Sequence, residues 1–207
     1  SNVAITGDLL ASTQINDHQE LAYSGIDSSR SVNNVWNFTN SGILFGTADL
    51  IFGWEAVDMD GGADPLQFKS GYYNGSNWSL PGVTAPTAGS IQVNGVTGFG
   101  EFAVGEKVAV KKWTGNDFTS DWFTPKNWFG GLPDAETATL IPNGISGGRV
   151  YPVLTAGTGT VADMTIENAA SLIVSNAVLQ IGGSVSNTGL FSAADGTIEF
   201  NGTAAQT

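Results

Sequence analysis

The chain lacks cysteine, carries a single histidine, and has few basic residues and no long apolar run. Without cysteine it has no disulfide, no zinc–thiolate site and no thiol nucleophile, and the redox compartment is left open. Seven Lys and Arg stand against nineteen Asp and Glu, a formal net charge of −12, so phosphate backbones and anionic lipid surfaces repel the chain. No stretch approaches the roughly 20 apolar residues of a transmembrane helix. We therefore expect no nucleic-acid partner and no membrane insertion.

Helical periodicity is missing as well. Apolar residues alternate in short runs that are separated by Gly, Asn, Asp and Ser. Glycine is abundant, with 28 residues, and a hydrophobic content of 41% is enough to fill cores. This composition predicts an all-β fold, and the length of 207 residues allows one large or two modest domains.

The first half, residues 1–110, has the features of an antiparallel β-sandwich of immunoglobulin-like or jelly-roll-like type. Turn formers separate its apolar runs at regular intervals, at residues 40–42, 60–62, 74–76 and 94–95. The strongest local signal is Asn74-Gly75, which fits the tip of a hairpin with aromatic residues on both flanks. We expect one sandwich domain that ends near residue 110.

The second half, residues 111–207, begins with three tryptophans in a segment rich in turn formers. Each indole can bury a large apolar area, while polar side chains satisfy the backbone of the loop. The residues expected to form this structural cap are Trp113, Trp122, Asn127 and Trp128. An uncapped stack of strands would expose an apolar core and free strand edges, so a cap is needed at one end.

Beyond residue 160, apolar residues occur in pairs spaced by two, as one face of a strand requires. The pairs are Met164 and Ile166, Leu172 and Val174, Leu179 and Ile181, and Ile198 and Phe200. Three such faces make a coil of about 20 residues, which is typical of a parallel β-helix or solenoid. We expect a Trp-capped parallel β-helix over 111–207.

Several of these motifs resemble one known group of proteins. The motifs are Arg30 with residues 35–39, residues 73–78 and 95–106, Trp113-Thr114-Gly115, Asp121-Trp122, Asn127-Trp128, Pro133, Ile141-Pro142, Tyr151-Pro152 and the segment 196–207. With them the chain resembles repeat modules of the very large surface adhesins of Bacteroidetes, including gliding-motility adhesins and other type IX secreted proteins. The resemblance implies a secreted, extracellular location at the cell surface, a role in cell adhesion, and neighbouring repeats of a longer chain as partners.

Catalytic chemistry has weak support in the sequence. His18 is the only histidine, and its polar neighbours predict a solvated surface residue. Glu55, Asp58, Asp60 and Asp64 are candidates for a glycosidase carboxylate pair, although acidic residues are common here. Lys111-Lys112 is interpreted as a linker, or as a pair of charges on an edge strand that prevents another strand from pairing there. We expect no enzymatic activity.

Two binding alternatives stay open. Asp58, Asp60 and Asp64 flank two glycines and predict either an acidic turn, which we favour, or a calcium loop that lacks the later glutamate of an EF-hand. No other cofactor is expected. Four aromatic residues are candidates for a platform on which sugar rings stack, with core packing as the favoured alternative: Trp54, Tyr72, Tyr73 and Trp78.

The function that the sequence predicts is that of a non-catalytic structural and adhesive repeat module of a long extracellular bacterial protein. It would act as a stiff spacer, with surface polysaccharide as a second class of partner. The alternative is a carbohydrate-binding accessory region of a secreted polysaccharide-processing enzyme.

Overall fold

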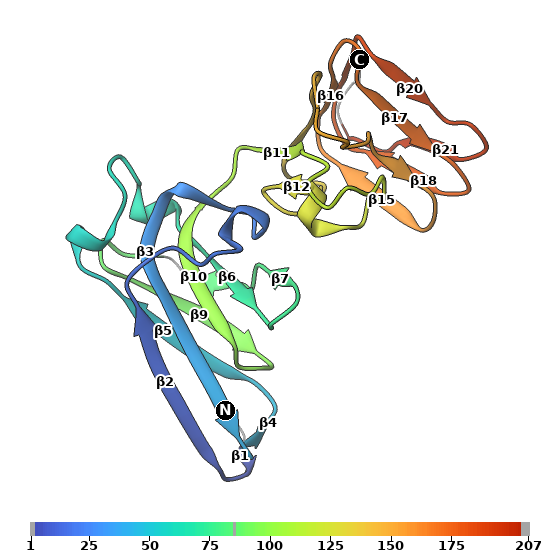
Figure 1. Ribbon diagram of the computed structural model, residues 1–207. Helices are drawn as coiled ribbons and strands as arrows, with labels where there is room; N and C mark the ends of the chain where they lie inside the picture. The colour runs from blue at the N-terminus through green and yellow to red at the C-terminus, as the bar shows by residue number, and fades with distance from the viewer. Residues whose placement is uncertain (1–2, 85, 204–207) are drawn as a thin grey trace. The chain divides into compact units, whose positions relative to one another are not determined.

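The computed structural model describes residues 3–84 and 86–203. The predicted all-β class is confirmed, because the described helices are only 3-10 turns of three residues, such as η1 (Leu21–Tyr23). The chain divides into two compact units, Ser1–Lys107 and Val108–Thr207 (Figure 1). A boundary after residue 110, as the sequence predicts, would cut through β11 (Val110–Trp113), which pairs with strands of the second unit.

The first unit contains antiparallel sheets. The larger has the strand order β2 (Asp8–Gln14), β3 (Ile26–Ser41), β10 (Glu101–Lys107), β6 (Lys69–Tyr73) and β7 (Trp78–Ser79). A second has the order β5 (Ala48–Gly53), β9 (Ser90–Val96) and β8 (Val83–Thr84), and β1 (Val3–Ile5) pairs with β4 (Leu44–Phe45). Most pairings join segments far apart in the sequence, as in Glu101 opposite Asn37.

The core of the first unit is aromatic and receives side chains from both larger sheets. Phe102 on β10 packs 5.1 Å from Phe52 on β5, and Phe52 packs 4.9 Å from Trp36 on β3, measured between ring centroids. Ile91 and Val93 on β9 complete the contact and are fully buried. Two sheets that share one buried layer make this unit sandwich-like.

The predicted hairpin lies between β6 and β7. Tyr73 pairs with Trp78, and the Asn74 side-chain oxygen accepts hydrogen bonds from the backbone N–H groups of Ser76 and Asn77. Gly75 at the tip has a φ of 94°, which glycine adopts without the cost that a β-carbon imposes. The hairpin therefore carries two aromatic side chains to one edge of the larger sheet.

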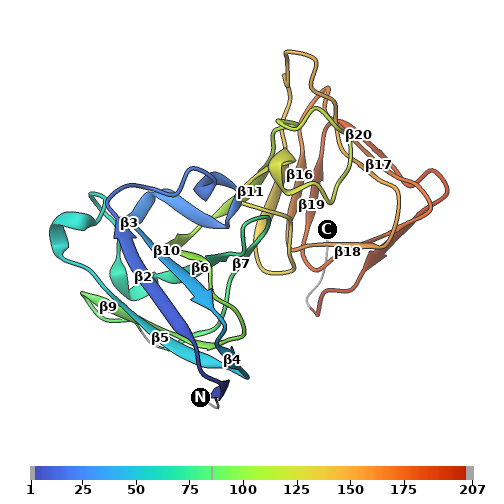
Figure 2. The same cartoon turned by 60° about the horizontal axis from the view of Figure 1, so that its bottom comes forward.

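The second unit is built from parallel ladders (Figures 1 and 2). The first runs through β11, β13 (Ala138–Ile141), β16 (Met164–Ile166) and β19 (Val185–Asn187), and β12 (Trp128–Phe129) pairs antiparallel with β11. The second runs through β14 (Val153–Leu154), β17 (Ser171–Val174) and β20 (Leu190–Ser192), and the third through β15 (Thr158–Val161), β18 (Val178–Ile181) and β21 (Thr197–Phe200).

The three ladders share one step length at their last pairing. Met164 lies opposite Val185, Ser171 opposite Leu190, and Val178 opposite Thr197, so this step spans about 20 residues, whereas the first ladder begins with longer steps, from Val110 to Ala138 and from Thr139 to Met164. Alternate residues of the inner strands point into one core, which contains aliphatic side chains and the three tryptophans. Three of the four predicted apolar pairs are fully buried there: Met164 and Ile166, Leu172 and Val174, and Leu179 and Ile181.

The fourth pair behaves differently. Ile198 is half-buried and Phe200 is 56% exposed, because β21 is the outer strand of its ladder among the described residues. In the interior, packing is close enough to favour glycine at position 159. A β-carbon there would lie 3.1 Å from the Trp122 indole nitrogen and from Leu154.

Candidate functional site

The tryptophan segment forms a closed aromatic cluster in the second unit. Trp113, Trp122 and Trp128 are at most 1% exposed, and Trp128 makes edge contacts with the other two rings at centroid distances of 4.9 and 4.8 Å. The Trp128 indole N–H donates to the Trp122 carbonyl at 2.8 Å, and the Trp113 indole N–H donates to the Val150 carbonyl at 2.9 Å. No ring face of the three is open to a ligand.

Asn127 organises the loop around these rings. Its side-chain nitrogen donates to the carbonyl and hydroxyl of Thr119 and to the Asp121 carbonyl, and its side-chain oxygen accepts from the Asp117 N–H at 2.9 Å. Its backbone carbonyl accepts from Thr114 N–H at 2.7 Å. A fully buried amide with every group satisfied holds an irregular loop in one conformation.

His18 is buried, which corrects the solvated surface position expected from its polar neighbours. It is 7% exposed, and its ring lies 4.9 Å from both the Tyr73 and the Trp78 rings. The aromatic pair comes from the β6–β7 hairpin, about 60 residues along the chain, so no local pattern around His18 could reveal the contact.

Both ring nitrogens of His18 are engaged. The backbone N–H of Glu20 donates to Nδ1 at 3.0 Å, so Nδ1 carries the lone pair and Nε2 carries the proton. Nε2 donates to Glu101 Oε2 at 2.5 Å, and the other oxygen of that carboxylate accepts from the Asn37 amide at 3.3 Å. Neither nitrogen is free to accept a proton from a nucleophile.

A polar cavity of about 290 Å³ lies beside this pair. It is lined by Gln14, Asn16, His18, Gln19, Val35 and Glu101. The side-chain amides of Gln14 and Gln19 have no hydrogen bond within the described residues, and the Glu101 side chain is 34% exposed. The cavity therefore presents amide donors and acceptors together with one carboxylate.

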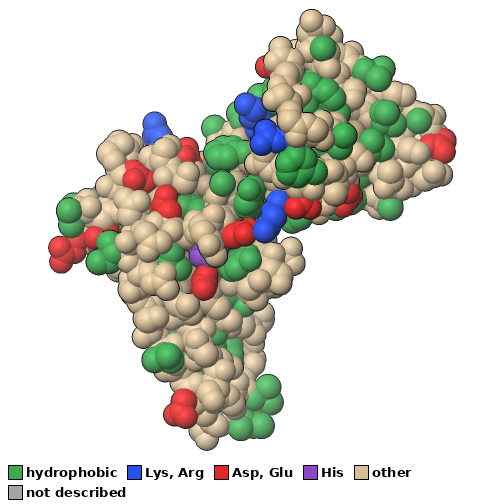
Figure 3. Space-filling view, viewed as in Figure 1, with side chains coloured by type: hydrophobic (Ala, Val, Ile, Leu, Met, Phe, Trp, Pro, Cys, Tyr) green, Lys and Arg blue, Asp and Glu red, His purple; other side chains and the backbone are tan. Residues whose placement is uncertain are grey.

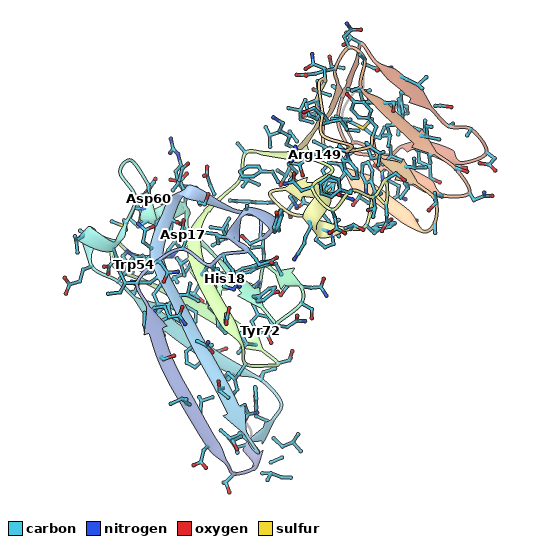
Figure 4. All side chains as sticks on the ribbon, in the orientation of Figure 1. Asp17, His18, Trp54, Asp60, Tyr72 and Arg149 are labelled. Carbon is cyan, nitrogen blue, oxygen red and sulfur yellow. The ribbon has the colours of Figure 1, made fainter. Side chains whose placement is uncertain are left out.

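The four candidate aromatic residues are divided between two places in the first unit. Trp54 is 8% exposed and packs 5.5 Å from Phe68 in the core, and Tyr72 packs 4.9 Å from Phe102 (Figure 4). Tyr73 and Trp78 instead lie together beside His18, 5.1 Å apart. Only the second pair adjoins the polar cavity residues.

The three candidate calcium ligands accept hydrogen bonds from different groups. Asp58 accepts from the Glu55 N–H at the start of η2 (Ala56–Asp58), Asp64 accepts from the Leu66 N–H, and Asp60 accepts from the Ser31 N–H at 2.8 Å. In the described part of the chain no group of three or more acidic, histidine or cysteine side chains is arranged to hold a metal ion. Calcium binding at these residues stays a prediction, which calorimetric titration with CaCl₂ tests.

Asp60 has a partner that the sequence did not reveal. Asp17 and Asp60 both accept from the Ser31 hydroxyl, at 3.2 and 3.1 Å (Figure 4). Burial raises the pKa of the Asp17 carboxyl, the Ser31 hydrogen bond opposes that rise, and the Asp60 charge adds to it. Two carboxylates that share one hydroxyl repel each other when both are ionised.

Lys111 is a buried ion-pair residue, which corrects its interpretation as a linker or guard. It is 5% exposed, and its amine lies 2.7 Å from Asp134 and also donates to the Leu132 carbonyl. Strand β11 alternates, so Lys112 points to the opposite side and is exposed. The two adjacent lysines thus have different environments.

Lys112 lines a second cavity, of about 350 Å³, in the second unit. The other lining residues are Trp113, Thr114, Asn116, Pro142, Asn143, Gly144, Ile145, Ser146 and Arg149. Two cations and no Asp or Glu line this cavity. The sequence analysis did not identify it, because residues 112 and 149 meet only through the pairing of β11 with β13 and the loop that follows.

Comparison of the chain with models of protein families, with curated proteins and with solved structures finds no match. Residues 3–84 and 86–203 contain no helix long and apolar enough to cross a membrane.

Proposed function

We propose that this chain is a non-catalytic structural and adhesive module of a long extracellular bacterial surface protein, in which it acts as a stiff spacer. The observation that carries the proposal is a step of about 20 residues that three parallel ladders around one core share at their last pairing. We interpret this unit as a parallel β-helix, with Trp113, Trp122 and Trp128 as the cap of one end.

A stack of coils suits a spacer for a physical reason. Each coil buries its apolar face against its neighbours, so opening one coil exposes the core of the next, and the stack resists local unfolding. The net charge of −12 keeps parallel copies of such a rod apart. The partners would be neighbouring repeats of the same protein, at the cell surface of the Bacteroidetes-like source that the motifs suggest.

Two features support a non-catalytic role. Both nitrogens of the only histidine are engaged, by Glu20 and Glu101. The tryptophan cluster, which is the most distinctive feature of the sequence, is buried and satisfied by backbone carbonyls. Its residues contribute to packing rather than to a reaction centre.

Duplication of one coil tests the spacer proposal. A second copy of residues 164–184 inserted after Ser184 preserves the step from Met164 to Val185. We expect a folded protein in which small-angle X-ray scattering shows the second unit lengthened by about 4.8 Å, with no loss of stability. The control insert has the same 164–184 composition in shuffled order. Equal destabilisation by both inserts would contradict the proposal.

The alternative function, a carbohydrate-binding accessory region of a polysaccharide-processing enzyme, is favoured by the amide-lined cavity beside His18 and Glu101. A glycan array separates the two functions. The spacer role expects no signal from this cavity, whereas the alternative expects binding that the double substitution Gln14→Ala and Gln19→Ala removes.

A further inference from the structure

The cavity around Lys112 and Arg149 is electrostatically unusual for this chain. Only seven of its 207 residues are Lys or Arg, and acidic residues outnumber them by nineteen to seven. Two of the seven line one cavity whose wall contains no Asp or Glu. Figure 3 shows positive side chains on the second unit among mostly uncharged atoms.

Neither of these two cations is neutralised within the described residues. Lys111 pairs with Asp134, and Arg30 pairs with Glu106 at 3.5 Å, whereas Lys112 and Arg149 make no ion pair or side-chain hydrogen bond there. Two unpaired cations on one concave surface favour an anionic ligand. The arrangement therefore selects for charge opposite to that of the protein as a whole.

The loop that carries Arg149 is anchored at both ends. The Asn143 N–H donates to a Glu167 oxygen at 2.8 Å, and the Val150 carbonyl accepts from the buried Trp113 indole at 2.9 Å. Gly144, Gly147 and Gly148 have φ between 67° and 81°, so the loop needs glycine to follow this path. Anchoring lowers the entropic cost of ordering the loop when a ligand binds.

The remaining lining groups indicate what kind of anion fits. Ser146 carries a hydroxyl, and Asn116 and Asn143 carry amides, whereas the Thr114 hydroxyl already bonds the Asn127 carbonyl and the Asn116 N–H. A guanidinium matches a carboxylate with two parallel hydrogen bonds, and amides and hydroxyls pair with sugar hydroxyl groups. A volume of about 350 Å³ lies in the range of small-molecule sites.

We propose that this cavity is a binding site for a uronic acid residue of an acidic polysaccharide. Arg149 and Lys112 bind the carboxylate, and the amide and hydroxyl side chains bind the ring hydroxyls. Arg149 lies on the loop of the second unit (Figure 4). The site is independent of the spacer role, because a β-helix with or without it would have the same core.

The test is isothermal titration calorimetry of the whole chain with oligogalacturonate. Its fully methyl-esterified form is the matched ligand control, since it keeps the sugar and lacks the charge. We expect binding of the acid form only. The double substitution Lys112→Gln and Arg149→Gln should weaken it by about ten- to a hundredfold, as expected for loss of charge-assisted hydrogen bonds.

The matched protein control is the double substitution Arg30→Gln and Lys69→Gln in the first unit, which changes the net charge by the same amount. We expect it to leave the affinity unchanged, and circular dichroism should show that both double variants stay folded. Equal weakening by the two variants, equal binding of the esterified ligand, or no binding of oligogalacturonate would overturn the proposal. Displacement by inorganic sulfate at the same concentration as the sugar would also overturn it, because the cavity would then recognise only an oxyanion.

Discussion

The two units of this chain both bury the apolar faces of β-strands, but they pair their strands in different ways. The first joins strands distant in sequence into antiparallel sheets around aromatic side chains such as Trp36, Phe52 and Phe102. The second stacks strands, most of them about 20 residues apart, into parallel ladders around aliphatic side chains, and its tryptophans lie together in one cluster. The position of the aromatic residues follows from this difference.

In a sandwich-like unit, two sheets about 10 Å apart leave a layer that large rings fill. In a stack of short parallel strands, each layer is small, and Leu, Ile and Val fill it in register. Substitutions in the two units should therefore differ in how much they lower the unfolding free energy and in how much of the chain they destabilise.

The largest effect is expected for Trp122→Ala or Trp128→Ala. Both side chains are almost fully buried, and a cavity left there should cost about 3 to 5 kcal/mol of unfolding free energy. Hydrogen–deuterium exchange should show lost protection across 108–203, with 3–84 and 86–107 unchanged. Phe123→Ala is the control, because Phe123 is 41% exposed and should change little. Uniform loss in both units would contradict the comparison.

Asn127→Ala should have the next largest effect. It removes several hydrogen bonds made by a fully buried amide, among them those with the Asp117 N–H and the Thr119 carbonyl, and their loss should cost about 1 to 3 kcal/mol in all. Denaturant unfolding measures the loss. Asn168→Ala, at an exposed position of the same unit, is the matched control. A loss no larger than that of the control would show that the loop does not depend on this amide.

Glu101→Gln should have a smaller effect, in the first unit. The two oxygens of Glu101 accept hydrogen bonds from His18 and from Asn37. A glutamine side chain has one oxygen and one NH2 group, so its NH2 group would face either the His18 or the Asn37 donor. We expect a cost of about 1 kcal/mol. Adding Asn37→Ala removes the competing donor and should recover part of the loss, which a double-mutant cycle measures. Simple additivity would argue against a shared carboxylate.

The smallest effect is expected for Asp17→Asn, and it is stabilising. Burial raises the pKa of Asp17 in the folded state above the ordinary value of 3.8, so the folded protein favours the neutral form. Stability from this group is therefore present below pH 3.8 and is lost as the pH rises through the raised pKa. Asp17→Asn should have a higher melting temperature at pH 7, and the difference should vanish in acid. A difference that persists below pH 3.8 would contradict the role of ionisation.

Local patterns were sufficient for the features that depend on neighbours in the chain. Apolar pairs spaced by two, such as Leu172 and Val174, identified the buried faces, because the side chains of a strand alternate. Asn74-Gly75 identified a hairpin tip, because glycine accepts a positive φ there. The same patterns did not predict which polar side chains are buried. His18 and Lys111 have polar or charged neighbours in sequence, yet both are buried by distant residues.

The sequence by itself determined the all-β class, the buried faces of the central strands and the presence of an aromatic cluster, since each depends on alternation, composition or a short turn. Only the tertiary structure decided which residues meet. Glu101 on β10 bonds His18 in the loop after β2, Asp17 meets Asp60 through Ser31, and Lys112 and Arg149 line one cavity because β11 pairs with β13. The physical reason is that pairing between distant strands places side chains within a few ångströms whatever their separation along the chain.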